Sequence, residues 1–551
     1  MTYKNYLTHI EDGIRGNWDQ PAMTNMGGET ISYGELAARI EKLHILFEAA
    51  GLKAQDKVTL YARNSVNWCA SFLAASTFEA TVVPLLNDFT PESAMGLIDH
   101  SDSVLLFTDD DKFRKLDIAR MPRLKAVVSL SDFSLLYNGV GEALAGATTP
   151  AALEETFAKR FPAFGPLDVH YPTDNWDKIA LINYTSGTSS APKGVMLSYR
   201  NLSSNMQFGH EAVPNKAGDN IVSMLPLAHM YGMIWEFLYQ IHGGCHIYFL
   251  GRVPSPKVLL NSFAQVQPYM MITVPLVIEK VFKNSVFPVV HKRYMKALLR
   301  IPFAAQLIKA RIRAKIMDAF GGKLKYMFIG GAAISKEVED WMKALRLPYS
   351  VGYGMTECAP LIGYSAWESY VKGSCGRIVS RMEVRVDSED PEHIVGELQV
   401  RGDNVMVGYF KNEDATRAAF TADGWMRTGD LGLIDEGGNI FIKGRSKNMI
   451  LSANGQNIYP EEIEDQLNNQ PYIVESVVVE RDKKIVALVY PDYDRVSQES
   501  LDENALARLM DENRINLNLL LPLYSQIAKI ELRKEEFEKT PKRSIKRFKY
   551  K

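Results

Sequence analysis

The stretch 183–195 constrains this chain more than any other. It has the sequence Asn-Tyr-Thr-Ser-Gly-Thr-Ser-Ser-Ala-Pro-Lys-Gly-Val and follows an apolar run, 179–182, that is typical of a buried strand. Five hydroxyl residues stand in it: Thr185, Ser186, Thr188, Ser189 and Ser190. Small residues such as Gly187 let backbone N–H groups approach an anion, and Lys193 can neutralise its charge. The stretch is therefore a candidate phosphate-binding loop.

This loop differs from the common P-loop of nucleotide kinases. A P-loop needs Gly-Lys followed by Ser or Thr at the start of a helix. Here Lys193 precedes Gly194, and Val195 follows. Clusters of Ser, Thr and Gly also form ordinary surface loops, so phosphate binding needs support from other parts of the chain.

Composition narrows the class of protein. The chain has 551 residues, 46% hydrophobic and 23% charged, which suits a globular protein with more than one domain. A net charge of −2 gives no basis for a nucleic-acid partner. The four cysteines form no CxxC pair, which disfavours a zinc site or a disulfide framework and suits a reducing cytoplasm.

No membrane span is expected from the sequence. The first ten residues lack the apolar core of a signal peptide. The most apolar long segment, 221–250, is interrupted by His229, Glu236, His242 and glycines. We expect a cytoplasmic protein, and peripheral contact with a membrane stays open. The segment 280–325, rich in Lys, Arg and apolar residues, predicts an amphipathic helix pair, with a membrane-facing or substrate-tunnel surface as the alternative.

The N-terminal part alternates between strand and helix patterns. Strand-like runs occupy 56–61, 80–85, 103–108 and 126–130, and a helical pattern covers 65–78. Ser32 and Glu35 have the spacing of a capping box before another helix. Such alternation favours α/β layers around a largely parallel sheet.

The composition changes near residue 445. Before it, 396–402 and 424–450 have the alternation and tight turns of an antiparallel sheet; after it come a charged helix at 461–467 and strands at 475–480 and 484–490. The predicted fold class is thus α/β, with a large N-terminal domain of layered α/β sheets plus a small antiparallel β-rich subdomain (1–445). A small α+β C-terminal domain (446–551) follows.

Polar residues after strands mark further site candidates. Gly331 follows a strand at 324–329, where a glycine turn permits close approach of a flat ligand. Tyr353 offers a ring to stack on a base, and Glu357 offers a carboxylate. A carboxylate beside phosphates needs a cation such as Mg²⁺ between them; otherwise it is a surface acid. Asp430 can accept hydrogen bonds from a ribose diol.

With these segments in this order, the chain resembles the adenylate-forming superfamily of acyl-CoA synthetases, luciferases and adenylation domains over nearly its whole length. The resemblance implies two half-reactions at one site. A carboxylate attacks the α-phosphorus of MgATP, which gives an acyl adenylate and pyrophosphate. A thiol, usually that of CoA, then attacks the acyl carbon and expels AMP.

The resemblance also implies roles for individual residues. The loop 185–194 matches the family's Thr-Ser-Gly-Thr-Thr-Gly-x-Pro-Lys-Gly loop for the β- and γ-phosphates, with Ser189 for Thr and Ser190 for Gly. The nucleotide contacts implied elsewhere are Gly331, Ala332 and Tyr353 at the adenine, Gly354 beside them, Thr356 at a phosphate, Asp430 and Arg445 at the ribose, and Glu357 at Mg²⁺. His229, otherwise a core histidine, matches a position near the reacting carboxylate and the thiol channel.

The C-terminal domain is expected to rotate between the two half-reactions. Lys447 matches the family's hinge residue, and a hinge needs only a few residues that absorb the dihedral change. The rotated face would bring Gly455 beside the pantetheine of CoA. The C-terminal domain is therefore predicted to be mobile.

One departure from the family concerns the lysine that orients the carboxylate and the α-phosphate. Aligning Ile545 and Arg547 with the family pattern places Ser544 at its position, and serine cannot supply that cation. Lys542 and Lys546 flank Ser544 at a spacing of two, which in an extended segment lies on one face. We expect one of them to substitute. The alternatives are impaired adenylation and a disordered basic tail.

The acid is the least constrained part. The pocket candidates are apolar, which favours an apolar acyl chain: Met230, Tyr231, Met233, Trp235, Met270, Val274, Leu276 and Ile362. The insert at 282–320 is similar to that of long-chain acyl-CoA synthetases. We therefore expect a medium- to long-chain fatty acid rather than an aryl acid. Transfer to a carrier-protein phosphopantetheine, and a binding protein that has lost turnover, are the alternatives. The oligomeric state is left open.

Overall fold

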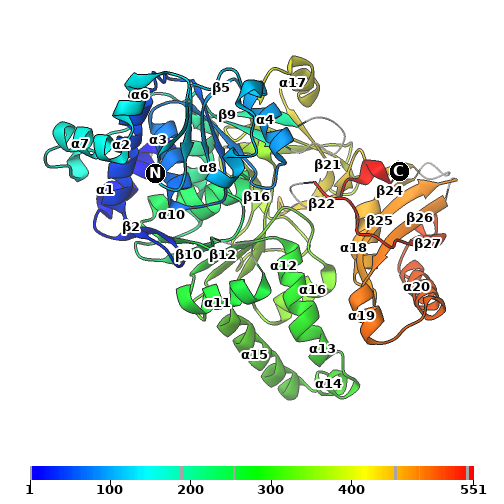
Figure 1. Cartoon of the computed structure of the whole chain (residues 1–551). Helices are drawn as coiled ribbons and strands as arrows, with labels where there is room; N and C mark the ends of the chain where they lie inside the picture. Colours follow the sequence, from blue (N-terminus) through cyan, green and yellow to red (C-terminus); the bar gives the residue numbers. More distant parts are fainter. Residues whose placement is uncertain are drawn as a thin grey trace.

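The computed structural model describes residues 3–185, 192–251, 255–451, 456–482, 484–540 and 545–550. A large N-terminal domain contains two extended sheets with helices on their faces (Figure 1). A small antiparallel sheet follows, and a separate α+β domain ends the chain. The predicted fold class is confirmed in these parts. The exact boundary at residues 445 and 446 stays a prediction.

The first large sheet has eight strands in the order β20-β9-β8-β4-β3-β5-β6-β7. Neighbours from β8 to β6 are parallel, and the outer strands β9, β20 and β7 are antiparallel. The strands are β3 (Lys57–Tyr61), β4 (Thr81–Leu85), β5 (Ser103–Thr108), β6 (Ala126–Ser129), β7 (Leu135–Asn138), β8 (Ile179–Thr185), β9 (Lys193–Ser198) and β20 (Gly408–Tyr409). The four runs predicted between residues 56 and 130 correspond to β3 to β6, so those predictions are confirmed.

The second large sheet has seven strands in the order β14-β13-β12-β10-β11-β1-β2, parallel except for β2. The strands are β1 (Pro21–Asn25), β2 (Thr30–Ser32), β10 (Asn220–Ser223), β11 (His246–Phe249), β12 (Met270–Thr273), β13 (Tyr326–Ile329) and β14 (Tyr349–Val351). Parallel strands present their carboxyl ends at one edge, where α/β proteins bind ligands. The loops after β10, β12, β13 and β14 therefore meet at that edge.

A buried helix packs between the two sheets. All twelve residues of α3 (Val66–Thr77) are buried, and it contacts β3 and β4 of one sheet and β1 of the other. A mostly apolar helix that is buried on every side belongs in such a core. Helix α2 (Tyr33–Ala49) begins with the predicted capping box, since Ser32 Oγ accepts from Glu35 N at 3.1 Å and Glu35 Oε2 accepts from Ser32 N at 2.7 Å.

The small antiparallel sheet has the order β18-β19-β21-β22. Its strands are β18 (Met382–Asp387), β19 (Gly396–Gly402), β21 (Met426–Ile434) and β22 (Ile440–Arg445). The C-terminal domain pairs β25 (Ile473–Arg481), β26 (Lys484–Pro491) and β27 (Lys529–Leu532), and packs helices α18 (Pro460–Asn468) and α20 (Glu503–Asn518) on them. Figure 1 shows this domain beside β22, at the right of the view.

A succession of helices forms an arm that projects from the large domain (Figure 1). It contains α12 (Pro275–Val281), a π-helical segment (Phe282–Val286), α13 (Phe287–Val290), α14 (Arg293–Leu298) and α15 (Pro302–Ala319). The sequence predicts a helix pair here, and the structure has more, shorter helices before α15. Among the described residues, no helix combines the length and apolar character needed to cross a membrane.

Glu236 is an acidic residue in the core. It lies on the helical segment Met233–Leu238, is fully buried, and accepts hydrogen bonds at 3.0 Å from Ser223 Oγ, Met224 N and Leu225 N. These contacts fix the turn that follows β10. Burial raises the pKa of Glu236 to about 8, although the three donors act in the opposite direction.

We expect Glu236→Gln to change how stability depends on pH. Because the folded-state pKa of about 8 exceeds the ordinary value of 4.5, the stabilisation by Glu236 is complete below pH 4.5 and is lost as pH rises through 8. Relative to the variant, the wild type should lose on the order of 3 kcal/mol between pH 5.5 and 8.5. Urea unfolding at several pH values measures this difference.

The exposed Glu389 supplies the matched control, Glu389→Gln. That variant should follow the wild-type pH dependence. Parallel pH curves for the wild type and Glu236→Gln would show that the buried carboxyl does not titrate as described.

Candidate active site

Three predicted nucleotide contacts form one hydrogen-bonded cluster. Tyr353, on the short strand β15 (Tyr353–Gly354), donates its hydroxyl to Asp430 Oδ2 at 2.7 Å. Arg445 Nε lies 2.6 Å from Asp430 Oδ1. Asp430 and Arg445 are register partners on β21 and β22, so sheet pairing itself brings them together. In the sequence, Tyr353 lies 77 positions and Arg445 lies 15 positions from Asp430. The fold brings the three side chains together.

The environments of the two charged groups differ. The side chain of Asp430 is 4% exposed, whereas that of Arg445 is 55% exposed. Burial raises the pKa of Asp430, while the charge of Arg445 and the hydroxyl of Tyr353 lower it. A carboxylate has about four lone-pair sites, and two partners leave some of them for a hydroxyl ligand. The cluster can therefore accept hydrogen bonds from a diol.

A second cluster joins Lys193, Tyr409 and Glu357. Lys193 Nζ lies 4.8 Å from the centroid of the Tyr409 ring, and the Tyr409 hydroxyl donates to Glu357 Oε1 at 3.0 Å. These residues come from β9, β20 and the 3₁₀ turn Thr356–Cys358. Tyr409 was not predicted from the sequence, because an isolated tyrosine in a Gly-Tyr pair carries no recognisable motif. Tyr409 therefore contacts a cation over its ring and a carboxylate at its hydroxyl.

The candidate phosphate loop connects the last pair of an antiparallel ladder. Thr185 of β8 is the register partner of Lys193 of β9, and Thr185 Oγ1 lies 3.5 Å from the Lys193 carbonyl oxygen. The other predicted residues of this loop, Ser186, Gly187, Thr188 and Ser189, lie outside the described residues, as do Gly455 and Lys542. Their assignments stay predictions.

Two glycines at the site are constrained differently, Gly331 by its backbone conformation and Gly354 by the lack of space for a side chain. Gly331 has φ +87°, a conformation that other residues rarely adopt, and a Cβ there would have only Val274 within 4 Å, at 3.9 Å. A Cβ on Gly354 would lie 2.2 Å from the Pro360 carbonyl oxygen. Both Gly331 and its neighbour Ala332 are exposed, so backbone is accessible to a ligand at this turn.

His229 follows β10 and caps the next helical turn. Its Nδ1 accepts a hydrogen bond from Tyr231 N at 3.2 Å, and its ring is half-buried. Thr356, in contrast, is buried at the start of its 3₁₀ turn. His229 therefore has a capping role that the sequence did not indicate, and its predicted role at the reacting carboxylate stays a prediction.

An apolar pocket lies at the same edge of the seven-stranded sheet. Its lining is Val213, Tyr231, Trp235, Phe328, Gly352, Leu361 and Tyr364. Of the predicted pocket residues, Tyr231 and Trp235 line it. Met230, Met233, Met270 and Ile362 are instead fully buried in the core, and Leu276 is 48% exposed. The remaining lining residues come from the end of a helix (Val213) and from strands and their connections, and periodicity could not show that these lie together.

The C-terminal segment carries its own ion pairs. Lys546 Nζ contacts Glu538, which also binds Lys549. Arg547 donates to both oxygens of Glu464, at 2.6 and 2.7 Å, and burial raises the pKa of Glu464 to about 7. Lys546 is thus placed in the C-terminal domain on a carboxylate that a second lysine shares.

Contacts also join the C-terminal domain to the rest of the chain next to the predicted hinge. Lys443 Nζ of the large domain lies 3.1 Å from Glu462 Oε1 of the C-terminal domain, and within the C-terminal domain Asn448 donates to Glu461 Oε1 at 2.6 Å. Lys447 itself is exposed directly after β22. Ion pairs of this partly exposed kind are individually weak, so they are compatible with domain rotation.

The donors available for a cation are few. Among the described residues, no group of three or more His, Cys, Asp and Glu side chains could hold a metal ion. Mg²⁺ commonly uses one or two carboxylates and completes its shell with water and substrate phosphates. Glu357 fits such an ion as a single carboxylate ligand, with Lys193 nearby as a further cation for phosphates.

Comparison with known families matches nearly the whole chain. A profile described as AMP-binding enzyme matches residues 10–410, and one described as AMP-binding enzyme C-terminal domain matches residues 447–550. The peroxisomal long chain acyl-CoA synthetase 7 of Arabidopsis thaliana is 26% identical over 544 residues, which cover 92% of this chain and 76% of that protein.

Solved structures share the fold. The ATP-bound MatB from Rhodopseudomonas palustris superposes with a TM-score of 0.78 at 21% identity, covering 100% of this chain and 98% of that one. O-succinylbenzoate Coenzyme A synthetase (MenE) from Bacillus subtilis in complex with AMP gives a TM-score of 0.74 at 20% identity, covering 100% and 98%. At these identities the likeness extends to the fold alone.

Proposed function

Since this chain belongs to the AMP-binding enzyme family, we propose that it joins a medium- to long-chain fatty acid to CoA through an acyl adenylate. The first half-reaction releases pyrophosphate and the second releases AMP. The observation that carries the choice of acid is the apolar pocket, whose lining contains no charged side chain. The name of the Arabidopsis relative supports the same class of acid.

The clusters of the site fit the steps of this reaction. Asp430 and Arg445 would hold the ribose, with Tyr353 against the adenine. Lys193, the loop 185–189 and Thr356 would hold the phosphates, and Glu357 would bind Mg²⁺, which screens the charge of the triphosphate. His229 stands at the entrance of the helical turn that also carries Tyr231 of the pocket.

The pocket needs no cationic partner for an apolar chain. Aromatic rings from Tyr231, Trp235 and Phe328 surround it, and Gly352 leaves space at one wall. Each buried CH₂ of an acyl chain contributes about 0.8 kcal/mol, so pocket depth should decide the preferred chain length. An aryl acid would use only part of this lining.

We expect Gly352→Val to shift the preference toward shorter acids. A Cβ at Gly352 would meet its nearest neighbours at 3.5 and 3.6 Å, which is ordinary contact, so the fold should tolerate the change. The added methyl groups would occupy space for about two or three CH₂ groups, which lowers kcat/KM for a long acid roughly tenfold or more. Activity with a short acid should be retained.

Gly96→Val is the matched control for the pocket variant. Gly96 is exposed on α4 (Pro91–His100), and a Cβ there meets nothing within 4 Å. Its chain-length profile should equal that of the wild type. An unchanged profile for Gly352→Val would show that this pocket does not hold the acyl chain.

The proposed function is tested by AMP release over acids of increasing length, with and without CoA. A fatty acid:CoA ligase should release AMP at a high rate only with CoA present, with a maximum at medium or long chains. Greater acceleration by a phosphopantetheinylated carrier protein than by CoA would identify that thiol as the acceptor. Binding of ATP and fatty acid without AMP release would favour the homologue with impaired adenylation, which Ser544 motivates.

A further inference from the structure

The helical arm, residues 275–319, carries a concentration of positive charge. Between Glu279 and Asp318 the sequence contains ten Lys and Arg residues and no Asp or Glu, whereas the whole chain has a net charge of −2. Within the part of the chain that the structure describes, His291 pairs with Glu337 at 3.0 Å, but the neighbouring cations Lys292, Arg293, Lys296 and Arg300 have no carboxylate partner. All four are exposed.

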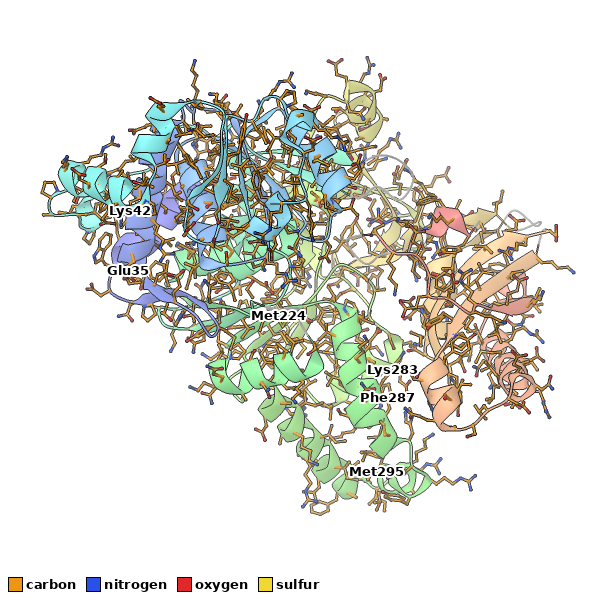
Figure 2. The ribbon with its side chains drawn as sticks, in the orientation of Figure 1. Glu35, Lys42, Met224, Lys283, Phe287 and Met295 are labelled. Atoms are coloured by element: carbon orange, nitrogen blue, oxygen red, sulfur yellow. The ribbon has the colours of Figure 1, made fainter. Side chains whose placement is uncertain are left out.

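Large apolar side chains are exposed at the same end of the arm. Phe303 is 74% exposed and Tyr294 is 59% exposed, and Ile301 and Leu307 are each 53% exposed. Figure 1 shows that α14 and the start of α15 form the far tip of the arm, and Figure 2 shows Met295 at this tip. Exposed apolar side chains that cluster instead of being scattered mark an interaction site.

We propose that this tip, residues 289–307, docks on an anionic lipid surface. Neither the exposed cations nor the exposed apolar side chains would by themselves select a lipid surface over other partners. Unpaired cations are attracted to anionic headgroups, and aromatic and aliphatic side chains between them can enter the headgroup boundary. A nucleic acid would bind the cations but would leave the aliphatic side chains exposed to water. An acidic protein surface would bind the cations but would offer no apolar region to bury the exposed ring of Phe303.

The arm suits peripheral rather than spanning attachment. Helix α15 has 18 residues, about 27 Å in length, but contains Lys309 near its middle and Arg311, Arg313 and Lys315 in its second half. Only its first half could approach the acyl region, with the basic half at headgroup level. This surface is independent of the acid that the enzyme uses, so docking and activity can be measured separately.

The experiment is sedimentation of the full chain with vesicles of phosphatidylcholine alone and of phosphatidylcholine with phosphatidylglycerol. We expect at least tenfold stronger binding to the anionic vesicles, weakened by salt. The variant Lys292→Gln, Lys296→Gln, Arg300→Gln should weaken that binding by about a hundredfold, since each cation near such a surface contributes about fivefold. Tyr294→Ser with Phe303→Ser and Leu307→Ser should weaken binding by a similar factor.

Matched variants elsewhere test whether location matters. Lys53→Gln, Lys115→Gln and Lys484→Gln neutralise three exposed lysines, and Leu167→Ser, Ile394→Ser and Val140→Ser replace three exposed apolar residues. These controls should bind vesicles as the wild type does. AMP release with a water-soluble short acid should be the same for every variant, and it reports on the proposed function separately. Absence of binding to anionic vesicles, or equal binding by tip and control variants, would overturn the proposal.

Discussion

Replacing Asp430 by alanine is expected to lower ATP–pyrophosphate exchange by about a hundredfold or more. The carboxylate is 4% exposed and holds Arg445 at 2.6 Å and the Tyr353 hydroxyl at 2.7 Å. A hydrogen bond to a charged group contributes about 1.5–3 kcal/mol, and two such bonds to a ribose diol would be lost together. Exchange at saturating acid, measured over a range of ATP concentrations, reports the loss as kcat/KM for ATP.

Asp423 provides a matched acid–arginine pair in the same sheet region. It contacts Arg385 at 2.7 Å, but its side chain is 56% exposed. The Asp423→Ala change breaks this ion pair outside the candidate site. Exchange should therefore change less than about twofold, and stability should change little because exposed ion pairs are weak. Equal exchange rates for the two variants would exclude Asp430 from nucleotide binding. A folded Asp430→Ala protein, judged by its thermal transition, is required for the comparison.

The fold could be predicted largely because its signals are local. The apolar runs that correspond to β3, β4, β5 and β6 are buried strands, and the Ser32 capping box begins α2 as its spacing indicates. Each of these features depends on neighbours within a few residues. Layered, largely parallel sheets also follow from strand–helix alternation, which requires crossover connections between parallel strands. Their strand order, in contrast, depends on contacts that no local pattern encodes.

In the candidate site, too, the residues in local motifs could be predicted and those brought together by the fold could not. Asp430, Arg445 and Tyr353 stand in recognisable segments, and the structure brings them together. Tyr409, which contacts Glu357, and Phe328 of the pocket were missed because their positions matter only after β20 and β13 have joined their sheets. The apolar residues Met230 and Met233 were assigned to the pocket because composition cannot distinguish a pocket wall from a core.

The ion pairs of Lys546 in the C-terminal segment could not be predicted from sequence spacing. Lys546 was selected because it flanks Ser544, and the structure places its ammonium on Glu538. Lys549 contacts the other oxygen of the same carboxylate. If Lys546 moved away, Glu538 would still be paired with Lys549. Solvent also screens the Lys546–Glu538 pair, so breaking it costs little free energy. The contact is therefore compatible with movement of Lys546 to the site in the predicted rotation of the C-terminal domain.

We therefore expect Lys546→Ala or Lys542→Ala to lower ATP–pyrophosphate exchange by about a hundredfold, since removing one preorganised charge at a developing negative charge costs this much in other enzymes. Thioester formation from supplied acyl adenylate and CoA should be nearly unchanged, because the lysine acts before the adenylate exists. Lys549→Ala, which removes the other cation from Glu538, should leave both rates near wild type. Full exchange in both Lys542→Ala and Lys546→Ala would mean that neither lysine replaces the one missing at Ser544.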